Sequence, residues 1–108
     1  MFTTYKNWNI EAETGYKPIT TFYMDFSIAD RFGIAAVKDT YRRAFEAWKD
    51  NYKYLTELVM VLCWKQYEHY EKNQALTKVY YSLWEQARSY ALDTLKGEEF
   101  EYFWNCTD

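Results

Sequence analysis

The sequence predicts a single all-α domain: a small helical bundle of three principal helices, with short flanking helices and an irregular N-terminal arm. Three observations support this fold class. No glycine or proline occurs between Ile34 and Lys96, so most of the chain can form helix. Apolar residues recur at intervals of three and four along much of that segment. Within it, Leu58–Trp64 is an unbroken apolar run, too short to span a bilayer and typical of a buried helix.

Length, charge and cysteine content narrow the class of protein. The chain has 108 residues, which fits one domain that can bury a core without disulfides or metals. Its net charge is −3, so it has no overall positive field for nucleic acid or an anionic membrane. Cys63 and Cys106 do not suggest a disulfide framework, and no basic and apolar leader begins the chain. We therefore expect a cytoplasmic protein with no cofactor and no membrane contact.

The aromatic content is unusual for a domain of this size. Aromatic residues make up 22% of the chain, with 12 tyrosines and 5 tryptophans. Such side chains have an apolar body and a polar group, and they concentrate in cores and at interfaces. The composition is therefore consistent with a tyrosine-rich core, and also with a binding surface made of some of these rings.

The N-terminal part contains the least regular segments. Residues 1–19 show no helical or alternating period and are predicted to form an irregular arm, followed by one helical domain over residues 20–108. Residues 20–24 favour a short extended piece, because β-branched and aromatic residues cluster there. Ser27 is a candidate N-cap for a short helix over residues 28–32. Gly33 then suits a left-handed C-cap.

Two principal helices follow in the middle of the chain. Residues 34–49 carry apolar side chains on one helical face. Asp50 and Asn51 favour a break, since both residue types cap helices, and the central helix is predicted from Asn51 to about Lys72. The pattern leaves one alternative open, a single bent helix over residues 34–72.

The third principal helix and a short final helix complete the bundle. Asn73 is a natural N-cap for a helix over residues 74–96, and Gly97 suits its C-cap. Residues 98–104 are predicted to form a short helix, with acidic residues at its positively polarised N-terminus.

One face of the central helix is a candidate partner surface. Apolar and aromatic side chains there interrupt a face that otherwise carries Glu57, Glu68 and Glu71. A large apolar anchor with a polar rim is typical of protein interfaces. The candidate residues are Met60, Val61, Trp64 and Tyr67. The alternative interpretation is that another helix of the same chain covers them.

No residue pattern predicts an enzyme or a metal site. His69 is the only histidine, and its neighbour Glu68 points about 100° away on a helix, so we expect a hydrogen-bonded histidine rather than a metal ligand. Cys63 lies within the apolar run and is expected to act as a small hydrophobe. With three glycines in all, the chain also lacks a glycine-rich phosphate loop.

A basic stripe supports an alternative, DNA-associated function. Residues 28–34 resemble the first helix and turn of a helix-turn-helix, although the helix that follows is too long for that motif. Cations that suit phosphate contacts lie in and after this segment. They are Arg31, Lys38, Arg42 and Lys49. Acidic neighbours and the negative net charge count against nucleic-acid binding.

Three segments carry a resemblance to known proteins: residues 25–33, 39–41 and 48–58. Through them the chain resembles small uncharacterised helical proteins carried by conjugative or phage-like mobile elements of gut bacteria. The similarity covers about residues 20–108 and includes no catalytic signature. It implies a bacterial cytoplasm and an accessory role. Together these observations suggest a non-catalytic interaction protein that binds a protein partner or a second copy of itself through an aromatic helix surface.

Overall fold

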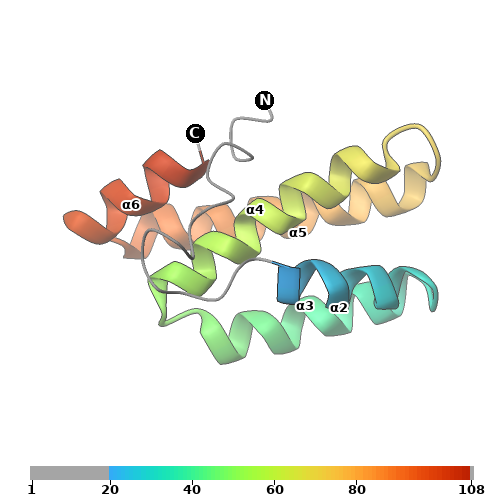
Figure 1. Ribbon diagram of the computed structural model, residues 1–108, viewed down its shortest axis with the longest axis horizontal. Helices are drawn as coiled ribbons and strands as arrows, with labels where there is room; N and C mark the ends of the chain where they lie inside the picture. Colours follow the sequence, from blue (N-terminus) through green and yellow to red (C-terminus); the bar gives the residue numbers. More distant parts are fainter. Residues whose placement is uncertain (1–19, 108) are drawn as a thin grey trace.

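The computed structural model describes residues 20–107, and the predicted all-α fold is confirmed for them (Figure 1). Five helices follow one another with short connections. They are α2 (Thr20–Asp30), α3 (Ile34–Trp48), α4 (Tyr52–His69), α5 (Gln74–Thr94) and α6 (Glu98–Thr107). None of these helices has the length and apolarity needed to cross a membrane. The predicted arm, residues 1–19, lies outside the described part of the chain.

Helix α4 is the centre of the bundle, as predicted. It contacts each of the other four described helices, and its contact with α5 is the most extensive. The chain forms two antiparallel hairpins, α2–α3 and α4–α5, and α6 packs mainly on α4 (Figure 1). Because two reversals separate α3 from α5, these two helices run in the same direction.

The core is built around the apolar run of α4. Every residue from Leu55 to Cys63 is buried, so α4 has no solvent-exposed face over more than two turns. The other helices each contribute one buried stripe, as amphipathic helices do. The largest of these side chains are Phe22, Phe26, Tyr41, Leu76, Tyr80, Leu83 and Phe103.

The sequence prediction is wrong for the region around α2. Residues 20–24 are helical rather than extended, and Ser27 lies inside α2 rather than at its start. The reason is tertiary packing: Phe22, Phe26 and Ala29 are buried at helical spacing, whereas a lone strand would have no partner for its backbone.

Both predicted asparagine caps are found, whereas neither predicted glycine C-cap is: α5 ends at Thr94 with Leu95 as its C-cap, so Gly97 lies beyond it. The Asn51 side chain accepts hydrogen bonds from Lys53 N and Tyr54 N, which separates α3 from α4 and excludes one bent helix. Asn73 caps α5 in the same way. Gly33 has the predicted positive φ, 105°, but its ψ of −174° is extended, so it is the N-cap of α3 rather than a left-handed C-cap.

Candidate functional site

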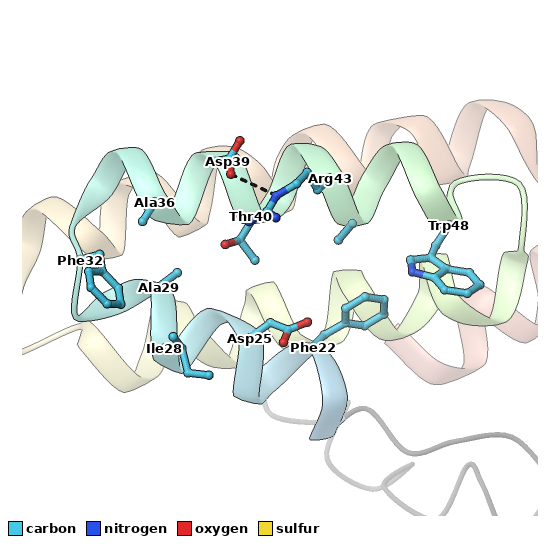
Figure 2. A pocket seen from close by; sticks show the side chains of 11 residues that line it. Phe22, Asp25, Ile28, Ala29, Phe32, Ala36, Asp39, Thr40, Arg43 and Trp48 are labelled. Atoms are coloured by element: carbon cyan, nitrogen blue, oxygen red, sulfur yellow. Dashed lines mark ion pairs between the residues drawn. The ribbon is translucent and has the colours of Figure 1, made fainter.

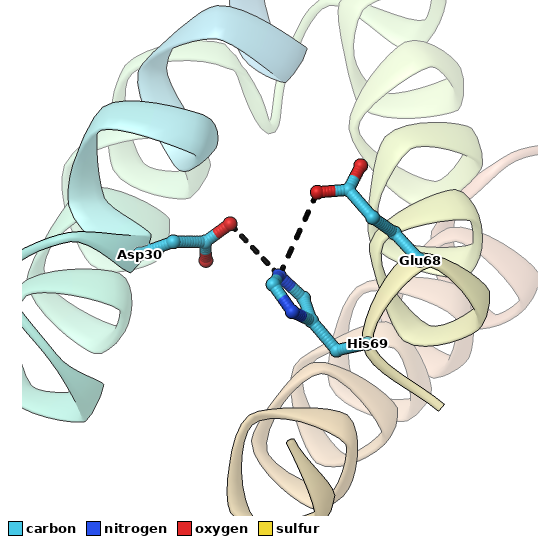
Figure 3. A group of neighbouring side chains, drawn as sticks. All are labelled: Asp30, Glu68 and His69. Atoms are coloured by element: carbon cyan, nitrogen blue, oxygen red, sulfur yellow. Dashed lines mark hydrogen bonds and ion pairs between the residues drawn. The ribbon is translucent and has the colours of Figure 1, made fainter. Parts of the chain in front are cut away.

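A cluster of polar side chains joins α2, α4 and α5 at one end of the bundle. We call it the polar cluster. Its members are Tyr23, Ser27 and Asp30 from α2, Lys65, Glu68 and His69 from α4, and Tyr80 from α5. Figure 3 shows Asp30 and Glu68 pointing from separate helices toward the His69 ring. The cluster is a polar connection between the two hairpins.

Lys65 is the centre of the polar cluster. Its side chain has no exposed surface, yet its Nζ lies 2.7 Å from Asp30 Oδ2 and 2.9 Å from Glu68 Oε2. The same Nζ donates a hydrogen bond of 3.1 Å to Ser27 Oγ and lies 4.8 Å from the centre of the Tyr23 ring. A buried ammonium group is tolerated only with this kind of pairing.

The two carboxylates of the cluster accept several hydrogen bonds. His69 Nε2 lies 2.8 Å from Asp30 Oδ2, and the Tyr80 hydroxyl donates to Asp30 Oδ1 at 2.5 Å. Burial, together with this bond to Asp30, raises the pKa of Tyr80 far above its usual range. The Tyr80 hydroxyl therefore remains protonated near neutral pH, as its hydrogen bond to Asp30 requires.

Glu68 is stabilised in its charged form. Burial raises its pKa, but hydrogen bonds from Tyr23 and Lys65 and the charge of Lys65 outweigh burial and lower the pKa below its usual value. The Tyr23 hydroxyl donates to Glu68 Oε1 at 2.6 Å, and this bond is the main reason that the pKa of Tyr23 is raised. Each carboxylate of the cluster therefore receives donors from two helices.

Two carboxylates and one imidazole of the cluster, those of Asp30, Glu68 and His69, also lie close enough together to hold a metal ion. Ligand atoms of Asp30, Glu68 and His69 lie within 4.8 Å of one another. The expectation that adjacent Glu68 and His69 cannot converge is wrong, because long side chains at the end of α4 both bend toward α2. The cation between the two carboxylates is, however, the Lys65 ammonium group. A metal ion would have to displace this buried charge, so we interpret the group as an ion-pair cluster.

A groove between α2 and α3 lies on another side of α2. We call it the α2–α3 groove. It has a volume of about 480 Å³. Small residues, Ala29, Ala36 and Ala44, line it together with Thr40. Figure 2 shows Phe32 beside the turn at one end and Trp48 at the other. The space stays open because these side chains are small; larger side chains at the same positions would fill it.

The charges beside the α2–α3 groove are unequally paired. Arg43 Nε lies 3.0 Å from Asp39 Oδ2, and Arg42 lies 2.6 Å from Asp39 Oδ1. The hydrogen bond from Arg42 is the main cause of the lowered pKa of Asp39. Asp25, across the groove on α2, is exposed and forms no ion pair with any residue of the described chain. Within the part of the chain that the structure describes, Asp25 is therefore an acidic group of the groove that lies outside an ion pair.

The predicted aromatic surface of the central helix does not exist as one exposed patch. Met60 and Val61 belong to the core, so they cannot reach a partner while the chain is folded. Trp64 is half-buried, with its ring 5.1 Å from that of Tyr23. Tyr67 is also half-buried and lines a separate depression between α4 and α5. The prediction failed because α4 is covered on all sides from Leu55 to Cys63, including the face that carries the buried Glu57.

The predicted basic stripe is also divided by the structure. Arg31 is exposed beside the α2–α3 turn, while Lys49 is half-buried at the end of α3. Lys38 and Arg42 line a second groove, between α3 and α5. Arg42 lies within ion-pair distance of Asp39 and Glu46, which reduces its charge toward a phosphate.

Sequence reasoning did not find Asp30, Lys65 or Ser27 as members of a site. The available signal was Lys65 itself, a charged residue directly after the apolar run of a buried helix.

Comparisons of the chain with protein families, curated proteins and solved structures found no match. The function must therefore be argued from the geometry of this structure.

Proposed function

We propose that this chain is a non-catalytic interaction protein, and that it binds an amphipathic helix of a protein partner in the α2–α3 groove. One observation carries the proposal: three large apolar side chains at the groove remain exposed. Phe32 is 76% exposed, Ile28 52% and Trp48 39%. Apolar side chains gathered around a hollow are typical of a surface that another protein covers.

A helix fits this groove better than an extended strand does. The walls are two antiparallel helices with alanines between them, so a third helix can approach their backbones closely. The groove offers no unpaired sheet edge, which strand addition requires. A helix with apolar residues at positions i, i+4 and i+7 presents them as one stripe, and this stripe would cover Phe32, Ile28 and Trp48.

The charge of the groove indicates the chemistry of the partner helix. Asp39 is paired with Arg42 and Arg43, whereas Asp25 is not paired within the described chain. We therefore propose a lysine or arginine beside the apolar stripe of the partner helix, opposite Asp25. Complementary charge at an interface rim fixes orientation and partner choice more than affinity.

The polar cluster supports this function indirectly. It ties α2 to α4 and α5 through Asp30, Ser27 and Tyr23, while Ile28 and Phe32 remain free to contact a partner. A wall that is fixed before binding loses less entropy on association. The resemblance to mobile-element proteins adds the proposal that the partner is a protein of such an element and that the role is accessory.

The test uses a synthetic helical peptide with a leucine stripe and one lysine, added to the isotopically labelled full chain. We expect shifts of the Ile28, Ala36 and Phe32 signals in nuclear magnetic resonance spectra. The variant Phe32→Ser should weaken binding roughly tenfold or more, because truncated interface aromatics cost more than about 1.4 kcal/mol. Asp25→Asn should reduce the preference for the lysine peptide over a glutamate version.

Tyr81→Ser is the matched control, since Tyr81 is an exposed aromatic residue on α5, outside the α2–α3 groove. It should leave peptide binding unchanged. Equal binding by the Phe32→Ser variant and the wild type would refute the proposal. Light scattering adds a further outcome: if the wild-type chain is a dimer that Phe32→Ser dissociates, the groove binds a second copy and not a partner helix.

A further inference from the structure

The groove between α3 and α5 has the features of a small-molecule site. It has a volume of about 520 Å³, within the range of ligand pockets. Each wall carries one row of side chains spaced by four residues along its helix. The rows are Lys38, Arg42 and Glu46 on α3, and Lys78, Ser82 and Gln86 on α5.

The direction of the two helices makes this groove electrostatically asymmetric. Helices α3 and α5 run in the same direction (Figure 1). Lys38 and Lys78 each follow the first residue of their helix by four positions, so both lie near a helix N-terminus and toward the same end of the groove. Neither lysine forms an ion pair with any residue that the structure describes, whereas Glu46 at the other end approaches Arg42. The partial positive charges of two helix N-termini add to this end. The lysine end is therefore suited to an anion.

The floor of the groove is apolar, with one unpaired polar group. Phe45, Val79 and Leu83 line it together with Tyr41, which is 7% exposed. The Tyr41 hydroxyl has no hydrogen-bond partner among residues 20–107, and burial raises its pKa to about 12. The Tyr41 ring is buried, whereas its hydroxyl oxygen still reaches the surface of the groove, so this protonated hydroxyl can donate a hydrogen bond to a bound ligand.

We propose that the α3–α5 groove binds a small amphipathic anion, with its carboxylate or phosphate between Lys38 and Lys78 and its apolar body on the floor formed by Tyr41, Phe45 and Leu83. The Tyr41 hydroxyl donates to a polar atom of the ligand. This site does not depend on the proposed partner-helix groove, because the two grooves have no lining residue in common.

The test titrates the labelled full chain with octanoate, octyl phosphate and the uncharged octanol, and follows it by nuclear magnetic resonance. We expect both anions to shift signals of Lys38, Tyr41 and Ser82. The affinity for octanol should be lower than that for either anion by roughly tenfold or more. The two anions distinguish a carboxylate ligand from a phosphate ligand. Tyr41→Phe keeps the ring and should weaken anion binding without loss of stability, since the hydroxyl has no partner to lose.

The charge dependence is tested with the double variant Lys38→Gln and Lys78→Gln. It should weaken binding of both anions roughly tenfold or more and leave octanol binding unchanged. The control double variant Lys72→Gln and Lys96→Gln has the same net charge and alters exposed lysines outside the groove. Equal losses in both double variants would show a general charge effect and overturn the proposal. Equal affinity for octanol and the anions, or no binding at all, would overturn it too.

Discussion

The two hairpins of this molecule pack in opposite ways. In the α4–α5 hairpin, large apolar side chains fill the space between the helices, and α4 is buried from Leu55 to Cys63. In the α2–α3 hairpin, Ala29, Ala36 and Ala44 face a groove, while Phe32 remains exposed at its end. One chain therefore combines a filled hairpin that supplies stability with an open hairpin that offers a surface.

The contrast extends to the interactions that hold each hairpin in place. The α4–α5 pair is held mainly by apolar burial, which is non-directional. The position of α2 depends in addition on the polar cluster, where Lys65 Nζ bridges Asp30 and Glu68. Hydrogen-bonded ion pairs are directional, so they fix α2 at one place on α4. Substitutions that separate these two contributions test this comparison.

The largest effect is expected for Lys65→Met. The substitution keeps an unbranched side chain but leaves Asp30 and Glu68 as close, partly buried carboxylates without their shared cation. Removing one partner of a buried ion pair typically costs about 3–5 kcal/mol of unfolding free energy. We expect a loss of that size in urea denaturation, together with increased hydrogen exchange in α2 relative to α5.

The triple variant Lys65→Met, Asp30→Asn and Glu68→Gln is the control for Lys65→Met. It removes the carboxylate charges as well, so it should be more stable than Lys65→Met alone. A loss below about 1 kcal/mol for Lys65→Met would show that the ammonium group is not a buried cation. The polar cluster would then not be what positions α2.

A smaller effect is expected at the turn between α2 and α3. Gly33 has φ 105° and ψ −174°, a combination that is almost restricted to glycine. A Cβ there would meet no atom within 4 Å, so Gly33→Ala tests backbone strain alone. We expect a loss of about 1–3 kcal/mol in thermal or urea unfolding.

Gly97→Asn is the matched substitution for Gly33→Ala. Gly97 has a φ of 60°, a left-handed conformation that asparagine tolerates. The loss of unfolding free energy in Gly97→Asn should therefore be clearly smaller than in Gly33→Ala. If Gly33→Ala stabilises the protein instead, the α2–α3 connection is helical, and the open hairpin is not the structure in solution.

Local signals in the sequence were sufficient for the filled hairpin. The apolar run of α4 and the capping residues Asn51 and Asn73 act within a few residues of the helices that they define. The start of α2 was not predictable in this way. Residues 20–24 have strand-like propensity, and only burial of Phe22 and Phe26 against other helices makes them helical.

The candidate site was harder to predict than the fold. The polar cluster joins Asp30 to Lys65 and Tyr80, residues far apart in the sequence, and no local pattern pairs them. The predicted surface at Met60 and Val61 was wrong because helix periodicity gives directions but not the number of neighbouring helices. Because four other helices contact α4, it has no free face from Leu55 to Cys63, where Met60 and Val61 lie.

The smallest expected effect concerns acid stability. The folded-state pKa of Glu68 is lowered below its ordinary value of 4.5, with the hydrogen bonds from Tyr23 and Lys65 outweighing the opposite effect of burial. A lowered carboxyl pKa contributes stability that is fully present above the unfolded pKa and is lost as the pH falls through the folded pKa. In Glu68→Gln this contribution is absent, so unfolding free energy should fall less steeply from pH 5 toward acid than in the wild type.

Glu71→Gln is the control for this measurement, because Glu71 is exposed on the turn after α4 and lies three residues from Glu68. It should retain the acid dependence of the wild type in urea unfolding followed by circular dichroism. Above pH 6 the unfolding free energies of Glu68→Gln and Glu71→Gln should differ, because only Glu71→Gln keeps the charged Glu68 carboxylate and its hydrogen bonds. This difference should shrink at lower pH, as the Glu68 carboxylate becomes protonated. A constant difference across the pH range would mean that Glu68 acts through its shape rather than its charge, and that α2 is held by packing in the same way as α5.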